Sequence, residues 1–106
     1  MANLQFERRQ LGQTSINLTV LGFGGSRIGN MYGPIPESEA ILAIIAAFDA
    51  GVRYFDTAPL YGHGLGEERT GMALLGRARQ DFNLSTKVGR LLDLEPSGTH
   101  KDSTKI

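Results

Sequence analysis

The chain has 106 residues, which suits one domain with a modest core and falls short of the larger enzyme architectures. Lysine plus arginine and aspartate plus glutamate number 11 each, so no basic surface is expected to bind nucleic acid or an anionic membrane. The absence of cysteine excludes a disulfide framework, a thiolate zinc site and a nucleophilic thiol.

The expected partner is therefore a small molecule, and no residue is assigned to a metal site. The N-terminal segment MANLQFERRQ carries charges where a secretory peptide needs an apolar core. The longest apolar run, Ala40–Phe48, is too short to span a bilayer. We expect a cytoplasmic protein.

The first predicted element is a β-hairpin. Apolar and polar side chains alternate over Phe6–Arg9 and Ile16–Val20, and the segment QLGQTS between them has the composition of a turn. The next run, VLGFGGS at Val20–Ser26, is apolar and ends in paired glycines. It predicts a buried strand whose end lets another group approach its backbone.

Two helices and two strands follow a loop around NMYGPIP. The first helix is predicted over Glu37–Ala50, with Gly51 as its stop and an apolar face of Ile41, Ile44, Ile45 and Phe48. The second runs from about Glu67 to Arg79 and is expected to bury Met72, Leu74, Leu75 and Ala78. β-Branched and aromatic residues predict strands at Val52–Phe55 and Phe82–Val88.

Strands alternating with helices of this length predict parallel βαβ units, so the expected fold class is α/β. The final residues, LEPSGTHKDSTKI, are polar and lack periodicity, as in a loop or frayed end. We therefore expect a folded part over residues 1–92 and a polar loop or tail over residues 93–106.

The carboxyl ends of the predicted strands carry reactive side chains. In a parallel α/β arrangement these ends open on one face, where ligands and catalytic groups gather. The first strand ends in GGSR (24–27), the second ends in Asp56 with Tyr61 in the following loop, and the third ends in Lys87. A carboxylate, a phenol and an ammonium are thus expected to converge.

This trio suits proton transfer. An ammonium near a phenol favours the phenolate, and a carboxylate paired with the ammonium keeps it charged and oriented. Tyr61 can then give or take a proton. A proton donor aimed at a carbonyl oxygen suits reduction by a hydride, which must come from a bound nicotinamide because no side chain supplies one.

Each residue also has an ordinary structural interpretation. Taken alone, Asp56 is more readily explained as a cap of the turn before Thr57, and Tyr61 as a wall residue with its hydroxyl in water. Lys87 must reach solvent or find a partner, because buried lysines are rare unless paired. The three together, on separate strand ends, favour the catalytic interpretation.

Known phosphate-binding patterns are absent from the sequence. A Gly-x-Gly-x-x-Gly fingerprint starting at Gly22 fails at Arg27, and the one starting at Gly62 fails at Glu67. No Gly-Lys-Ser/Thr phosphate loop occurs either. The glycines around Tyr61 are better explained as flexibility in the loop that carries it.

The sequence resembles a known family. GVRYFDTAPLYGHGLGEERTGMAL followed by STKVGR is closely similar to the N-terminal third of the aldo/keto reductases, and ERRQLGQTSINLTVLGFGG resembles that family's opening. The resemblance extends from about Phe6 to Arg90. LGFGGSRIGNMYGPIPESEA is most similar to the branch that oxidises sugars or pyridoxal with a nicotinamide cofactor.

The resemblance implies the N-terminal part of an eight-stranded (β/α) TIM barrel whose bottom the hairpin closes. It also implies an oxidoreductase that uses NADP or NAD to interconvert a carbonyl and an alcohol. It assigns Asp56, Tyr61 and Lys87 to three places of a four-residue catalytic set. Tyr61 would be the acid in carbonyl reduction and the base in alcohol oxidation, with Lys87 and Asp56 tuning it.

The resemblance further implies contacts with ligands. The cofactor-binding residues expected from it are Gly25, Ser26, Arg27 and Asp56. Met31 and Tyr32 are placed at the substrate mouth, although loop contacts without a ligand are an equally good explanation. His63 lies close enough to Tyr61 to meet substrate, with an exposed loop histidine as the alternative.

The chain is shorter than the family's barrel. A complete barrel takes roughly 250 residues, and the family's fourth catalytic residue, a histidine on the fourth strand, has no counterpart here. His100 lies in the polar tail, where a solvated loop residue is the simpler interpretation. We therefore expect an incomplete barrel that is inactive alone. The alternative is a truncated, non-catalytic relative that acts as an interaction module.

Overall fold

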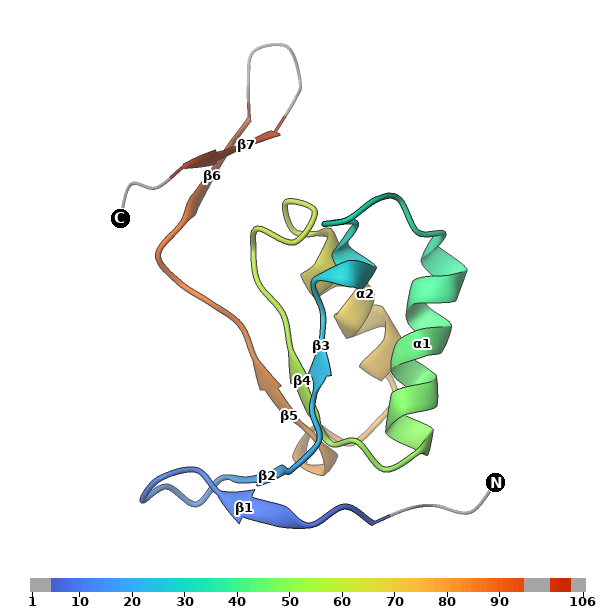
Figure 1. Cartoon of the computed structure of the whole chain (residues 1–106), viewed down its shortest axis with the longest axis vertical. Helices are drawn as coiled ribbons and strands as arrows, with labels where there is room; N and C mark the ends of the chain where they lie inside the picture. The colour runs from blue at the N-terminus through green and yellow to red at the C-terminus, as the bar shows by residue number, and fades with distance from the viewer. Residues whose placement is uncertain (1–4, 95–99, 104–106) are drawn as a thin grey trace.

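The computed structural model describes residues 5–94 and 100–103. Its centre is a three-stranded parallel sheet with the order β3-β4-β5. Helices α1 and α2 lie together on one side of this sheet (Figure 1). The strands are β3 (Phe23–Gly24), β4 (Tyr54–Asp56) and β5 (Asn83–Ser85), and the helices are α1 (Glu37–Asp49) and α2 (Leu65–Leu74). The predicted parallel βαβ units are confirmed.

An antiparallel hairpin precedes the sheet. Strands β1 (Arg8–Gln10) and β2 (Asn17–Thr19) pair with each other and lie across the lower end of the sheet in Figure 1. The buried Thr19 hydroxyl accepts a hydrogen bond from the Arg53 amide at 3.2 Å, just before β4 begins. The hairpin predicted from the alternation is confirmed, and it lies at the end of the sheet where the strands start.

The hydrophobic core fills the space between the sheet and the helices. Phe55 of β4 and Ile44 of α1 are fully buried there, and the Phe55 ring stacks on Phe48 at 6.4 Å. Successive side chains of a strand point to opposite faces. Because Phe55 faces the helices, its neighbours Tyr54 and Asp56 face the other side of the sheet.

Helix α2 is shorter than the predicted helix. It ends at Leu74 because Leu75 adopts an extended conformation and Gly76 has φ +91°. Of the four side chains expected to be buried, only Leu74 is; Met72, Leu75 and Ala78 are exposed. The residues that α2 buries are Gly66, Arg69, Thr70, Ala73 and Leu74.

The strand predicted over Val20–Ser26 is also shorter and less buried than expected. Val20 and Leu21 are each 52% exposed, and only Phe23 and Gly24 pair with β4. The apolar run does contain a strand, but among the described residues nothing packs over the side chains of Val20 and Leu21, so its first half stays exposed.

A second hairpin follows the sheet. Strands β6 (Leu91–Leu94) and β7 (His100–Ser103) pair in antiparallel fashion and project away from the helices (Figure 1). Residues 93, 94 and 100–103 are therefore strand, not the loop or tail expected there, because an antiparallel ladder rests on backbone hydrogen bonds and needs no apolar alternation. The rest of that segment, 95–99 and 104–106, lies outside the described residues, and the division at residue 92 stays a prediction.

Within residues 5–94 and 100–103, neither helix has the length and apolar character needed to cross a membrane.

Candidate active site

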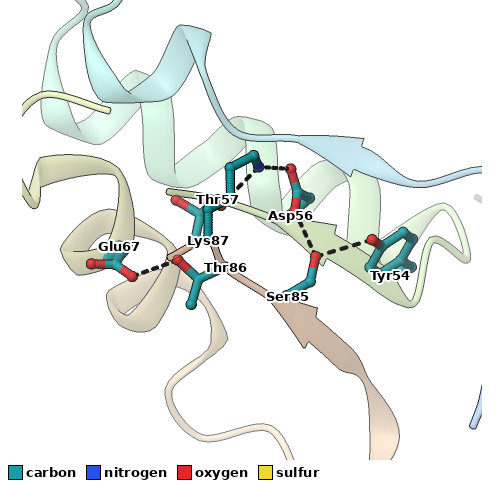
Figure 2. A network of polar contacts seen from close by, with 7 residues as sticks. All are labelled: Tyr54, Asp56, Thr57, Glu67, Ser85, Thr86 and Lys87. Carbon is teal, nitrogen blue, oxygen red and sulfur yellow. Dashed lines mark hydrogen bonds and ion pairs between the residues drawn. The ribbon is translucent and has the colours of Figure 1, made fainter. Parts of the chain in front are cut away.

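Asp56 and Lys87 form the centre of the site. Asp56 ends β4, Lys87 follows β5 by two residues, and the two strands are parallel neighbours, so both side chains emerge at the same end of the sheet. Lys87 Nζ donates to Asp56 Oδ2 at 2.6 Å and to the Thr57 carbonyl oxygen at 3.1 Å (Figure 2). The acid and the ammonium expected to converge are in direct contact.

Tyr61 lies beside this pair. It stands in the loop between β4 and α2, and Lys87 Nζ is 5.2 Å from the centre of its ring. The Tyr61 amide donates to the Ala58 carbonyl at 3.1 Å, and the Tyr61 carbonyl accepts from the Gly66 amide at 2.9 Å. The phenol and the ammonium share a pocket of about 250 Å³ lined by Ala58, Pro59, Leu60, Tyr61, Lys87, Val88 and Arg90.

The contact between Asp56 and Lys87 keeps both groups charged. Burial raises the pKa of Asp56, but hydrogen bonds from Lys87 and Ser85 and the charge of Lys87 outweigh it, so this pKa lies below its ordinary value. The pKa of Lys87 lies above its ordinary value, first because of the hydrogen bond to Asp56 and then because of the neighbouring Tyr61. Near neutral pH, a paired ammonium and carboxylate therefore stand next to the phenol.

The loop after β3 approaches Asp56 from the other side. The Gly25 amide donates to the Asp56 carbonyl at 2.8 Å, and a Cβ on Gly25 would lie 2.7 Å from the same oxygen, so only glycine fits there. Ser26 is half-buried and precedes a short 3-10 turn, η1 (Arg27–Gly29), on which Arg27 is exposed. The expected cofactor loop therefore lies at the active end of the sheet, and its contact with a cofactor stays a prediction.

The three residues proposed to meet substrate are placed differently. Met31 and Tyr32 are 40% and 76% exposed. Tyr32 and Arg27 line a separate pocket of about 110 Å³, which Tyr61 and Lys87 do not reach. His63 is half-buried in the Tyr61 loop and has a left-handed backbone, with φ 53°. Their roles toward substrate stay predictions.

A buried arginine fastens the loop between β3 and α1. Arg69 of α2 has a 7% exposed side chain, and its Nη1 donates to the Ile28 carbonyl at 2.8 Å and to Asn30 Oδ1 at 3.2 Å. The same Asn30 oxygen accepts from the Ile35 amide at 2.9 Å, and Glu37 lies 4.0 Å from Arg69 Nε. Arg69 therefore ties the segment that carries Arg27, Met31 and Tyr32 to helix α2.

We expect Arg69→Met to destabilise the protein by about 2–4 kcal/mol, because it leaves the Ile28 carbonyl without this buried donor and takes one of two donors from the half-buried Asn30 oxygen. Denaturant unfolding measures the change. Arg9→Met is the control: Arg9 has a 74% exposed side chain and its ion pair with Glu7 lies on the surface, so it should cost less than about 1 kcal/mol. Equal effects of the two substitutions would contradict the clamping role of Arg69.

Tyr61 packs against η1 without room for a side chain at Gly29. A Cβ on Gly29 would lie 2.6 Å from Tyr61 Cβ and 2.9 Å from the Tyr61 carbonyl oxygen. Gly29 is itself buried. The position of the phenol thus depends on a glycine in the neighbouring loop.

Gly29→Ala should therefore displace the Tyr61 loop and destabilise the protein by about 1–3 kcal/mol, the usual cost of overpacking. Gly71→Ala on α2 is the matched control, because no atom lies within 4 Å of its added Cβ. Alanine there should stabilise the helix by about 0.5–1 kcal/mol. Thermal unfolding measures the stability of both variants. If Gly29→Ala were as stable as the wild type, the loop would accommodate the methyl group and the prediction would be wrong.

Sequence reasoning missed two polar residues of the site. Ser85 donates to Asp56 Oδ1 at 2.6 Å, and its oxygen lies 3.0 Å from the Tyr54 hydroxyl. The two-residue period of a strand could have found both, because Tyr54 and Asp56, like Ser85 and Lys87, are two positions apart.

A parallel βαβαβ layer with a carboxylate, an ammonium and a phenol at its carboxyl ends is typical of (β/α) barrels, whose active sites lie at that end of the strands. The model of the aldo/keto reductase family matches residues 20–106, and the chain belongs to this family.

Two curated relatives are dehydrogenases of small molecules. The chain is 43% identical over 90 residues to D-threo-aldose 1-dehydrogenase of a Pseudomonas species, covering 81% of this chain and 27% of the relative. It is 40% identical over 92 residues to pyridoxal 4-dehydrogenase of Microbacterium luteolum, covering 87% and 27%. The predicted similarity to the sugar and pyridoxal branch is confirmed.

A solved structure supports the fold. The aldo-keto reductase AKR11C1 from Bacillus halodurans, in its holo form, matches with a TM-score of 0.76 and 37% identity, over 89% of this chain and 30% of that chain. This confirms the predicted fold class, the N-terminal part of a (β/α)₈ barrel. The chain spans between 27% and 30% of the length of these three proteins.

Proposed function

We propose that this chain provides catalytic groups of an oxidoreductase that interconverts a carbonyl and an alcohol by hydride transfer with NADP or NAD. The observation that carries the proposal is the position of Lys87, 2.6 Å from Asp56 and 5.2 Å from the Tyr61 ring centre. The names of the two relatives, which give an aldose and pyridoxal, support a small polar substrate.

The pocket beside Tyr61 fits the reactive ring of a nicotinamide. Its volume of about 250 Å³ is below the roughly 300–1,000 Å³ of pockets that enclose a drug-sized ligand, so it suits one ring rather than a dinucleotide. Pro59, Leu60 and Val88 give it apolar walls. The loop of Gly25 and Ser26, which lies against Asp56, and the exposed Arg27 would hold the nicotinamide end.

The residues of this chain handle the proton, while the bound nicotinamide supplies or accepts the hydride. In carbonyl reduction, the Tyr61 hydroxyl donates its proton to the carbonyl oxygen; in alcohol oxidation, the phenolate takes the proton back. The Lys87 ammonium stabilises the phenolate, because opposite charges attract strongly where water is partly excluded. Asp56 holds that ammonium in place through the 2.6 Å hydrogen bond.

The test is turnover by the full-length protein that carries this chain. Reduced and oxidised nicotinamide cofactors would be assayed with a panel of aldoses, pyridoxal and the corresponding alcohols. We expect turnover with NADP or NAD in the full-length protein and none in the 106-residue chain alone, because the family's catalytic histidine has no counterpart here. A folded full-length protein that binds cofactor but converts nothing would contradict the proposal.

A second function is favoured by exposed apolar side chains on β5 and in the segment that follows it. Leu84 is 41% exposed, Leu91 is 53% exposed and Val88 is 99% exposed. Among the described strands β5 pairs only with β4, so its other edge is open. An interaction module would pair this edge with a partner. Partner binding that persists in Tyr61→Phe, with no turnover by either form, would favour this function.

A further inference from the structure

The Asp56 carboxylate has a second partner besides Lys87. Its Oδ2 accepts from Lys87 Nζ and its Oδ1 accepts from Ser85 Oγ, each at 2.6 Å. The Ser85 oxygen in turn lies 3.0 Å from the Tyr54 hydroxyl oxygen. Figure 2 shows the resulting row of side chains across β4 and β5, with Tyr54 at one end and Lys87 at the other.

The protons in this row point in one direction. An ionised carboxylate only accepts hydrogen bonds, so the Ser85 O–H donates to Asp56. A serine hydroxyl has one proton, so the Ser85 oxygen is left to accept from the Tyr54 O–H. Hydrogen bonds that lead to a charged group are stronger than those between neutral groups, and a chain of them strengthens each member. The row therefore orients the carboxylate from the side opposite Lys87.

The strand register explains why these residues meet. Asp56 pairs with Ser85 across the parallel strands β4 and β5, and Tyr54 stands two positions before Asp56. All three side chains thus lie on the sheet face away from the helices, with Tyr54 diagonal to Ser85. The pairing is built into two strands rather than into loops, so the carboxylate is held by a rigid element.

We propose that Ser85 and Tyr54 are positioning residues of the active site. They fix the Asp56 carboxylate in the rotamer that pairs with Lys87, and through that pair they keep the ammonium facing Tyr61. This inference rests on the proposed function for its effect on catalysis, but the orientation of Asp56 is testable without any turnover.

Within the residues that the structure describes, charged and titratable groups face Asp56 from several sides, and Tyr54 reaches it through Ser85. Lys87 faces it from the segment after β5, and Tyr61 faces Lys87 from the loop after β4. Arg90 lines the same pocket as Tyr61 and Lys87. On the β3 side, the register partner of Asp56 is Gly24, which brings no charge. A change in the titration of Asp56 after removal of the Ser85 hydroxyl is therefore attributable to that hydrogen bond.

The first experiment follows the Asp56 side-chain carbon by NMR as pH is lowered, in the full-length protein with labelled aspartate, using Asp56→Asn to assign the signal. We expect Asp56 to titrate at a higher pH in Ser85→Ala than in the wild type. Tyr54→Phe should move it in the same direction by less, and Ser85→Thr, which keeps a hydroxyl, should restore it. An unchanged titration in Ser85→Ala would overturn the proposal.

The second experiment measures kcat/KM against pH for the same variants. Ser85→Ala should lower kcat by about tenfold with little change in KM, since it removes a hydrogen bond to a charged group of the site and no contact with substrate. Thr86→Ala is the matched control, because it removes a hydroxyl that donates to Glu67 at 2.7 Å, away from Asp56. Equal losses in Ser85→Ala and Thr86→Ala would overturn the positioning role.

The two experiments separate the two claims. A full-length protein without nicotinamide-dependent turnover would refute the proposed function, while the NMR titration would still decide whether Ser85 holds Asp56.

Discussion

Tyr61→Phe is expected to lower kcat/KM of the full-length protein by about a hundred- to ten-thousand-fold, the usual contribution of general acid–base catalysis. The substitution removes one oxygen and keeps the ring that packs against Gly29. Without the hydroxyl, the carbonyl oxygen receives no proton as the hydride arrives, because among the residues that the structure describes no other phenol lines the pocket shared with Lys87.

The same variant should bind the cofactor and unfold at nearly the same temperature as the wild type, since nothing is removed from the core. Stopped-flow mixing of enzyme, reduced nicotinamide and carbonyl substrate would isolate the chemical step. A rate of hydride transfer in Tyr61→Phe equal to that of the wild type would remove Tyr61 from its assigned role.

Lys87→Met is expected to lower kcat by about a hundredfold or more, because the ammonium proposed to stabilise the phenolate is lost while most of the length of the side chain is kept. The cost to stability should be at most about 1 kcal/mol: the Lys87 side chain is 49% exposed and that of Asp56 is 33% exposed, so solvent screens the pair. Large catalytic and small stability effects together distinguish a catalytic ammonium from a structural one.

Arg77→Met provides the comparison for Lys87→Met. Arg77 forms an ion pair with Asp49 at 3.8 Å, between a partly exposed arginine and an exposed acid. Removing its charge should change kcat by less than about twofold. If Lys87→Met lowered kcat no more than Arg77→Met does, Lys87 would have no catalytic role.

The convergence of Asp56 and Lys87 was predictable because it follows from topology. Once alternating strands and helices indicate parallel pairing, residues at the carboxyl ends of neighbouring strands must share one face. No distance was needed for that inference. The contact at 2.6 Å adds what the sequence does not give, namely the rotamers that bring the two charges together.

The buried role of Arg69 was not predictable from its helix. A charged residue in an amphipathic helix ordinarily faces solvent. Only the fold shows that the Ile28 carbonyl and the Asn30 side-chain oxygen, both between β3 and α1, accept hydrogen bonds from Arg69. The prediction of the buried face of α2 was wrong for a different reason. The helix ends at Leu74, so the apolar Leu75 and Ala78 lie outside it and do not contribute to its buried face.

Ser85 and Tyr54 illustrate a different limit. Their spacing to Lys87 and Asp56 places them on the correct face, but a serine and a tyrosine in a strand are common on any face. The register of β4 and β5 is what makes Ser85 the neighbour of Asp56. The two strands are separated in the sequence by helix α2, so a local sequence pattern does not specify which of their residues pair.

The most direct test of hydride transfer uses a reduced nicotinamide with deuterium in both C4 positions and follows the label into the product of the full-length protein. We expect an alcohol with deuterium on the former carbonyl carbon, formed at a rate that drops in Tyr61→Phe. Product that carries no deuterium, or a folded protein that forms no product while it binds the labelled cofactor, would contradict the proposed hydride transfer.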